Sequence, residues 1–356
     1  MRLVCSPSRA NGPRRTRPSC APIGLLLALS CAPTAIGQIE FGDVDSITVS
    51  SLSQRIVMGD ADGTPAIFSV HKQTGAVSIT GGLSPDDAAT HQAYGAGLTP
   101  THAATADFDG DGDLDMIVVN VAQNAARVLL RQPDGSLVID QVITVGTAPL
   151  AVAIASVNHD GLPDAIVANS GSNTITLLQN NGAGRLISQG TYATGKRPSA
   201  VLGADLNGDG LGDLVAAAKD DNSITIFLAS PGGGHQPRVL TGIGSQPAGL
   251  GAADFDSDGD QDLVIASINS GSLILIGNNG AFGFEPPRYF ASGPLPNDLR
   301  IGDVNMDGMP DVVVATSGQA GVTALLGDGQ LGFSPVDIWL PEQPASVAIG
   351  DVNGEG

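Results

Sequence analysis

The chain has 356 residues and a formal net charge of −20, with 42% hydrophobic and only 4% aromatic residues. A chain this acidic lacks the basic face that phosphate groups need, so it is not expected to bind nucleic acid or an anionic membrane. The apolar fraction is too high for a disordered protein and indicates a packed core, in two ordinary domains or one large repeat domain.

Residues 1–37 have the features of a secretory signal peptide. Five arginines precede a short apolar run at 23–32, and small residues occupy 35–37, where a signal peptidase reads the chain. The apolar run is too short to span a membrane. We therefore predict cleavage after Gly37 and a protein that is extracellular, on the cell surface or periplasmic; a lipoprotein attached through Cys31 is the weaker alternative. All three cysteines precede the cut, so the mature chain has no disulfide.

Residues 38–99 read as a degenerate first repeat. The segment RIVMGDADGTPAIFSV at 55–70 aligns with MIVVNVAQNAARVLLR in the repeat that follows. The acidic loop of this degenerate repeat holds only Asp43 and Asp45, without a later acidic pair. Residues 81–98 are predicted to be an inserted, exposed loop.

Residues 100–356 repeat with a period of about 49 residues. Acidic segments begin at 107, 156, 205, 254, 303 and 351, so successive starts are 49, 49, 49, 49 and 48 residues apart. A proline lies seven residues before each start, at Pro100, Pro149, Pro198, Pro247, Pro296 and Pro344. Self-similarity at a fixed period indicates a repeat architecture in which each unit buries its apolar face against its neighbours. The last repeat is incomplete.

The repeat at 147–195 predicts four short strands. Apolar or β-branched runs occupy 150–156, 164–169, 174–180 and 185–194, with turns rich in Gly, Ser and Asn between the later ones. Four strands in ~40–50 residues is the size of a β-propeller blade. A parallel β-helix ranks lower, because its coils are shorter, roughly 20–30 residues. We therefore predict an all-β propeller with four-stranded blades.

The acidic segments share the pattern D-x-[DN]-x-[DN]-G-x-x-D. Oxygens at positions 1, 3, 5 and 9 can converge on one cation, position 7 offers a backbone carbonyl, and the Gly at position 6 permits a sharp bend. Oxygen donors without His or Cys select Ca²⁺ over zinc or copper. An EF-hand places its last carboxylate six residues after the Gly and lies between helices, whereas here the last acid follows after three residues and begins a strand.

The predicted calcium ligands lie in five loops, and metal-free Asp/Asn/Gly turns are the alternative. They are Asp107, Asp109, Asp111, Asp113 and Asp115; Asn158, Asp160, Leu162 and Asp164; Asp205, Asn207, Asp209, Leu211 and Asp213; Asp254, Asp256, Asp258, Asp260 and Asp262; and Asp303, Asn305, Asp307, Met309 and Asp311. Ser156 replaces the first carboxylate of the second loop, so that site is expected to be weak or empty. Bound calcium would stabilise a secreted chain that has no disulfides.

The motifs DFDGDGDLD, DLNGDGLGD, DFDSDGDQD and DVNMDGMPD, with the later NNGAFGF and GDGQLGF, resemble the FG-GAP repeats of integrin α-subunit propellers and the bacterial VCBS-repeat proteins. The resemblance covers residues ~41–356. It implies a seven-bladed propeller with calcium on hairpin loops at the outer edge, in an adhesion, recognition or scaffold module; some such modules are attached to enzymes. We expect a seven-bladed ring whose last blade is truncated. In the alternative, a six-bladed ring, PASVAIGDV at 344–352 supplies a strand that the first repeat lacks.

No catalytic constellation is evident. The stretch GDGQLG at 327–332 matches a dinucleotide fingerprint but precedes no helix, so a blade turn is favoured. The five histidines have no metal-ligand spacing, His159 is expected to point outward from its loop, and no G-x-S-x-G or H-E-x-x-H motif occurs. His91, Tyr94 and His102 form a modest polar group near the insertion. Trp339 is predicted to pack on a blade face.

Two functional interpretations follow. The favoured one is a secreted, monomeric binding, adhesion or scaffold module that recognises an extracellular protein or a carbohydrate with one propeller face. The alternative is a propeller-based polysaccharide lyase or hydrolase, or the non-catalytic propeller of one, because a fold does not fix a function.

Overall fold

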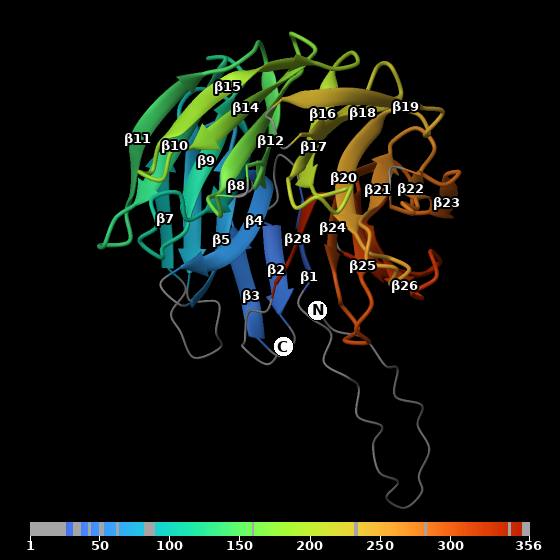
Figure 1. Ribbon diagram of the computed structural model, residues 1–356. Coiled ribbons are helices and arrows are strands. Elements are labelled where there is room, and N and C mark those ends of the chain that lie inside the picture. The colour runs from blue at the N-terminus through green and yellow to red at the C-terminus, as the bar shows by residue number, and fades with distance from the viewer. Residues whose placement is uncertain are drawn as a thin grey trace, which may run out of the picture.

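The computed structural model describes residues 26–30, 37–41, 44–49, 53–61, 64–81, 90–158, 160–230, 234–280, 283–340 and 343–350. Within these ranges every helix or strand assigned is a strand, and the sheets are antiparallel (Figure 1). The predicted all-β propeller is therefore confirmed.

Six sheets of four consecutive strands form the blades. Blade 1 contains β4 (Ser53–Ala61), β5 (Thr64–His71), β6 (Ala76–Gly81) and β7 (Thr90–Gly95). Blade 2 contains β8 (Pro100–Ala106), β9 (Asp115–Asn120), β10 (Ala125–Arg131) and β11 (Leu137–Thr144). Blade 3 contains β12 (Pro149–Ala155), β13 (Asp164–Asn169), β14 (Thr174–Asn180) and β15 (Leu186–Ala193).

The other three blades repeat this order. Blade 4 contains β16 (Pro198–Ala204), β17 (Asp213–Ala218), β18 (Ser223–Ala229) and β19 (His235–Thr241). Blade 5 contains β20 (Pro247–Ala253), β21 (Asp262–Ser267), β22 (Ser272–Ile276) and β23 (Arg288–Ala291). Blade 6 contains β24 (Pro296–Gly302), β25 (Asp311–Thr316), β26 (Gly321–Gly327) and β27 (Phe333–Trp339). In blades 2 to 6 the first strand begins at the recurring proline and the second at the ninth position of the acidic pattern, as the sequence predicts.

The first strands of the blades form the inner ring. β4, β8, β12, β16, β20 and β24 contact one another in turn, and β28 (Pro344–Ile349) lies between β24 and β4. β28 pairs with β1 (Leu26–Ser30), which lies inside the predicted signal peptide, while β2 (Gly37–Phe41) and β3 (Val44–Val49) form a separate two-stranded sheet.

The expected seven-bladed ring is not supported, because the described residues form six four-stranded blades. The six-bladed alternative differs in one detail from the structure. Blade 1 obtains all four strands from residues 53–95, so the strand at 344–349 does not complete its sheet.

Two predictions for the degenerate repeat are wrong. The segment at 55–70 falls on β4 and β5, the first and second strands of its blade, whereas the segment aligned with it falls on the second and third strands of blade 2. Residues 90–95, predicted as part of an exposed loop, form β7, the outermost strand of blade 1. The polar, mostly exposed sequence THQAYG gave no apolar alternation from which a strand could be predicted.

The hydrophobic core lies between neighbouring blades. The second strands of blades 2 to 6 are buried along their whole length, which explains their continuous apolar sequence. One core cluster joins blades 1 and 2 through Phe68 and Met116, and similar clusters join each later pair. The final cluster joins blade 6 to β28 through Val347. Full burial of each large apolar side chain stabilises the fold by about 1.5–3 kcal/mol.

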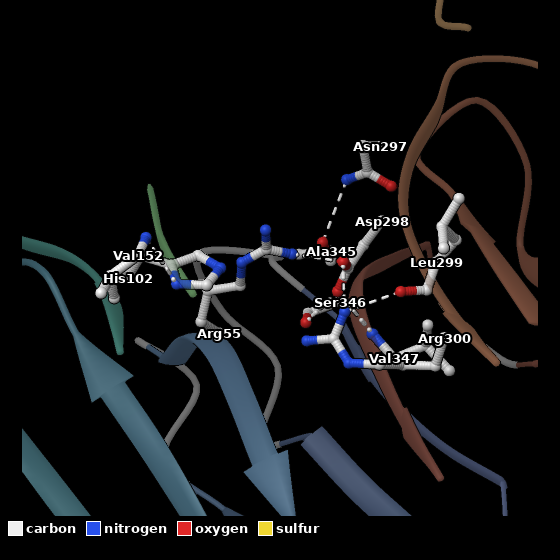
Figure 2. A network of polar contacts seen from close by, with 10 residues as sticks. All are labelled: Arg55, His102, Val152, Asn297, Asp298, Leu299, Arg300, Ala345, Ser346 and Val347. Carbon is white, nitrogen blue, oxygen red and sulfur yellow. Dashed lines mark hydrogen bonds and ion pairs between the residues drawn. The ribbon is translucent and has the colours of Figure 1, made fainter. Parts of the chain in front are cut away.

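A buried ion cluster joins blade 6, β28 and blade 1. Asp298 on β24 contacts Arg55 on β4 at 2.6 Å and Arg300 at 2.9 Å through its Oδ1 atom. Its Oδ2 accepts hydrogen bonds from Ser346 Oγ at 2.5 Å and Val347 N at 3.2 Å on β28 (Figure 2). Burial raises the pKa of Asp298, but the charges of Arg300 and Arg55 and the Ser346 hydroxyl outweigh burial and hold this pKa well below its usual range. The cluster connects segments from both ends of the chain.

Candidate metal centres

The five aspartate loops, residues 107–115, 156–164, 205–213, 254–262 and 303–311, join the first and second strands of blades 2 to 6. They therefore lie between the innermost strand and its neighbour, and not at the outer edge that the family resemblance implied. The glycine at position 6 has a positive φ in every loop, at Gly112 (95°), Gly161 (75°), Gly210 (82°), Gly259 (97°) and Gly308 (85°). The predicted sharp bend is present.

The carboxylate at position 1 organises the bend. Asp107 accepts hydrogen bonds from Gly110 N at 2.7 Å and from Gly112 N at 3.0 Å. The position-6 amides also donate to Asp205, Asp254 and Asp303, at 2.7, 3.0 and 2.8 Å. The position-1 carboxylate therefore holds the bend of these four loops through backbone amides.

The aspartate at position 9 is a buried connector. The Asp115 carboxylate accepts hydrogen bonds from Phe108 N at 2.9 Å and from Arg131 N at 2.8 Å. One side chain therefore connects its own loop to the end of the third strand. The same pair of bonds, at 2.7–3.0 Å, recurs at Asp164, Asp213, Asp262 and Asp311. Sequence reasoning assigned these residues to the metal alone and missed this role, although their position at the start of a buried strand was a signal for it.

Burial makes these connectors costly to ionise. It raises the pKa of Asp115, Asp213 and Asp262 to about 6 and also raises the pKa of Asp164 and Asp311, although the two backbone N–H groups oppose the shift. Nearby loop carboxylates raise the pKa further. A bound cation would favour the charged form and offset both effects.

Two loops bring three carboxylates together. The oxygens of Asp107, Asp109 and Asp115 in blade 2 lie within 4.8 Å of one another, and in blade 5 the same holds for the second group, Asp254, Asp256 and Asp262. These are the loops with aspartate at positions 1, 3, 5 and 7, so they carry the densest negative charge.

The residues of these two groups fit a cation. Burial and the neighbouring Asp111 raise the pKa of Asp109, and burial and Asp258 do the same for Asp256. Asp256 Oδ1 is buried and has no hydrogen-bond partner among the described residues. A buried carboxylate oxygen without a donor is costly, and a divalent ion held by these oxygens would compensate it.

The loops with asparagine at position 3 are arranged differently. The side-chain amides of Asn158, Asn207 and Asn305 donate to the position-5 carboxylates of Asp160, Asp209 and Asp307, at 2.7–2.9 Å. The position-3 nitrogen rather than its oxygen faces the position-5 acid in these loops, so a metal would require the amide to turn over.

The second loop differs further at its first position. The backbone oxygen of Ser156 accepts a hydrogen bond from Gly212 N of the next loop at 3.0 Å. The structure therefore offers no position-1 carboxylate there, in keeping with the sequence. His159, which was expected to point outward, and the acidic segment that begins at 351 lie outside the described residues.

Positions 5 and 7 are joined by a short turn. The backbone N–H of position 7 donates to the position-5 carboxylate at 2.8–2.9 Å in all five loops; these residues are Asp113, Leu162, Leu211, Asp260 and Met309. Asp111 and Asp258 therefore hold the loop through position 7 and are not part of the three-carboxylate groups.

The loops of blades 2 and 4 are packed against the blade that follows each of them. Asn180 Nδ2 donates to Phe108 O at 2.9 Å, and Asn278 Nδ2 donates to Leu206 O at 2.8 Å. A Cβ atom on Gly184 would lie 2.9 Å from Asp109 Cβ, so the turn of blade 3 requires glycine where it covers the loop of blade 2. Ions in the loops would therefore also stabilise the contact between blades.

The residues considered for catalysis are dispersed. His91 and Tyr94 lie on β7, the outermost strand of blade 1, whereas His102 lies on β8, the innermost strand of blade 2. The predicted polar group is therefore split between the rim and the centre. GDGQLG forms the turn between β26 and β27, as predicted.

Two further side-chain arrangements were not predicted. Trp339 is 75% exposed, so the prediction of a packed tryptophan is wrong. The hydroxyl of Ser78 lies 2.8 Å from His71 Nε2 and 2.7 Å from Ser69 Oγ, which resembles a nucleophile beside a base. All three are buried, so a substrate has no access to them.

Comparison with known proteins identifies the repeat. The sequence pattern of the FG-GAP-like repeat matches residues 107–167, 157–216, 205–265, 254–314 and 303–356. No curated protein matches this sequence. Within the described residues, no helix is both long and apolar enough to cross a membrane.

Several solved structures are similar in fold. A proposed 6-phosphogluconolactonase from Bacteroides fragilis has a TM-score of 0.71 and 14% identity, covering 94% of this chain and 100% of its own. A protein from Lactobacillus plantarum has a TM-score of 0.68 and 14% identity, covering 92% and 98%. The periplasmic gluconolactonase of Pseudomonas aeruginosa has a TM-score of 0.63 and 17% identity, covering 92% and 99%. At these identities the likeness shows the fold alone.

Proposed function

Because this chain belongs to the FG-GAP-like repeat family, we propose that it is a secreted calcium-binding β-propeller that acts as a binding, adhesion or scaffold module. The observation that carries the calcium assignment is the pair of three-carboxylate groups in blades 2 and 5, one with a buried oxygen that lacks a hydrogen-bond donor. Oxygen-only donor sets of this kind select Ca²⁺.

The calcium supports blade packing in this proposal. The loops contact the next blade, and the mature chain has no cysteine for a disulfide if the predicted signal peptide is removed. An ion that binds only the folded state stabilises it by about 2.7 kcal/mol per site at a 100-fold excess over its dissociation constant. The N-terminal signal sequence would take the protein to a compartment where calcium is plentiful.

The partner would be an extracellular protein or a carbohydrate that contacts one face of a monomeric propeller. Rigid blades present their connecting loops as a continuous surface, which is the usual way in which a repeat fold binds a partner. The dispersed histidines and the buried Ser78–His71 pair favour binding over catalysis.

An extracellular enzyme is the second candidate, favoured by one observation. The similar folds include a periplasmic gluconolactonase and a proposed 6-phosphogluconolactonase, and the polar side chains at the centre of the propeller include His102. Hydrolysis of sugar lactones or of polysaccharide by the purified full chain, abolished by His102→Ala, would favour this candidate over a binding module.

Thermal unfolding tests the calcium proposal. The melting temperature of the full chain should fall markedly when EGTA replaces calcium, and the double variant Asp254→Asn/Asp256→Asn should lose part of that shift. The matched control is Asn158→Asp, in the loop that lacks the first carboxylate, which should leave the shift of the other loops unchanged. A melting temperature that is the same in calcium and EGTA would contradict the proposal.

A further inference from the structure

A cavity of about 240 Å³ lies at the centre of the propeller, among the first strands of all six blades. Small residues such as Ala103, Ala153 and Ala248 form most of its wall. The charged lining residues and His102 gather on one side, where Arg55 and Arg300 reach the cavity beside Asp298, and Thr105 is a further polar lining residue. The wall is therefore mixed, and its charged side chains are confined to this group.

The charges in this group do not balance. Asp298 is held by two arginines, at 2.6 and 2.9 Å, although one counter-charge would neutralise it. Both of its oxygens already accept from other groups, because Oδ2 binds Ser346 Oγ and Val347 N. The group therefore has a net charge of about +1 in a chain whose formal net charge is −20.

Both arginines line the cavity. The side chains of Arg55 and Arg300 are 17% and 32% exposed, whereas that of Asp298 is 3% exposed. Each guanidinium carries five N–H donors, of which Asp298 takes only part, and Arg300 Nη1 also donates to Leu299 O at 2.7 Å. The carboxylate is thus covered while the cations remain open to a molecule in the cavity.

His102 supplies a neutral donor in the same place. Its Nδ1 lies 3.4 Å from Val152 N and accepts from it, which leaves the ring proton on Nε2. Burial lowers the pKa of His102 well below its usual value, and the positive charges of Arg55 and Arg300 lower it further. Figure 2 shows Arg55 between His102 and Asp298, and Arg300 lines the same cavity.

We infer that the central cavity binds a small organic monocarboxylate through Arg55, Arg300 and His102. A planar carboxylate matches the fork of a guanidinium, and one negative charge matches the net charge of the group. A phosphate dianion would leave one charge uncompensated in a cavity whose other lining residues are mostly apolar. The cavity is smaller than the ~300–1,000 Å³ of typical ligand sites, so the ligand is the size of a single sugar acid or smaller.

The site is independent of the aspartate loops. Its residues come from β4, β8 and β24 and include no proposed calcium ligand. Calcium binding can therefore fail its own test while carboxylate binding succeeds, and the reverse also holds.

Binding of D-glucuronate to the full chain, measured by isothermal titration and ligand-observed NMR, tests the inference. D-glucose is the matched neutral probe, because it has a hydroxymethyl group where glucuronate has a carboxylate, and acetate and inorganic phosphate are the smaller anions. Glucuronate or acetate should bind saturably and glucose should not. Absence of saturable binding by both carboxylates, equal binding of glucose, or tighter binding of phosphate would overturn the inference.

Variants locate the binding. Arg300→Gln should weaken carboxylate binding by on the order of 10- to 100-fold, because it removes a charge-assisted hydrogen bond. Arg300→Lys keeps the positive charge and should recover part of the lost affinity. The control Arg197→Gln removes a surface arginine paired with Asp220 and should change nothing. Unaltered binding by a folded Arg300→Gln variant would overturn the inference.

A second variant serves if Arg300→Gln does not fold. Ala153→Leu narrows the cavity and leaves every charge in place, so it should abolish binding of glucuronate. Full retention of glucuronate binding by this variant would place the carboxylate elsewhere and overturn the inference.

Discussion

Replacing Asp262 with alanine should destabilise the protein even without calcium. Asp262 is fully buried, and its carboxylate accepts hydrogen bonds from Phe255 N at 2.8 Å and from Asn278 N at 2.7 Å. Its removal leaves two buried N–H groups without an acceptor, and each costs about 1–3 kcal/mol. The free energy of unfolding should therefore fall by about 2–6 kcal/mol when it is measured by urea denaturation in EGTA.

Asp256→Ala is the matched comparison in the same loop. Asp256 Oδ1 has no hydrogen-bond partner among the described residues, and its neighbour Asp258 repels it. In EGTA this variant should cost little, whereas in calcium it should lose the stabilisation that the ion provides. If both variants lost the same free energy of unfolding in EGTA, the two backbone hydrogen bonds of Asp262 would not explain its contribution to stability.

Two other substitutions test the ring and the contact between blades. Asp298→Asn should lower the free energy of unfolding at pH 7 by up to about 3–5 kcal/mol, because it leaves two partly buried arginines without their counter-charge. Since the folded pKa of Asp298 is lowered, this stability is present above pH ~4 and is lost at lower pH, so urea titrations should show the difference between variant and wild type shrinking in acid. Gly184→Ala places a Cβ 2.9 Å from Asp109 Cβ at a φ of 73°, so it should lower the melting temperature and weaken calcium binding in blade 2. Unchanged melting and calcium affinity would show that this turn does not constrain the loop.

The blades could be predicted because their signals are local. The prolines, the acidic loops and the apolar strands that follow them recur at a fixed spacing, and each maps to one place in a blade. The glycine bends at position 6 were likewise predictable, because only glycine adopts a positive φ without strain.

The number of blades could not be predicted from local sequence signals. The acidic loop of the first repeat holds only Asp43 and Asp45, so its strands could not be aligned by the full motif, and β7 has a polar sequence that resembles a loop. The first and last blades meet where Asp298 contacts Arg55, a residue far from it in the sequence. No periodic pattern indicates such a contact.

The acidic residues were found from the sequence, but their separate roles were not. Spacing alone gives Asp256 and Asp262 the same function, whereas burial makes Asp262 an acceptor for two backbone amides and leaves Asp256 Oδ1 without a donor. The exposure of Trp339 was also missed, because a single aromatic residue in a strand has no alternation that fixes its face.

The number of calcium ions bound per chain is the most direct test of the proposed metal centres. Metal-stripped full chain, dialysed against calcium and analysed by elemental mass spectrometry, should retain at least two ions, one for each three-carboxylate group. The combined variant Asp107→Asn/Asp254→Asn should retain fewer. A chain that retains no calcium, with the variant indistinguishable from it, would contradict the assignment of these loops to a metal.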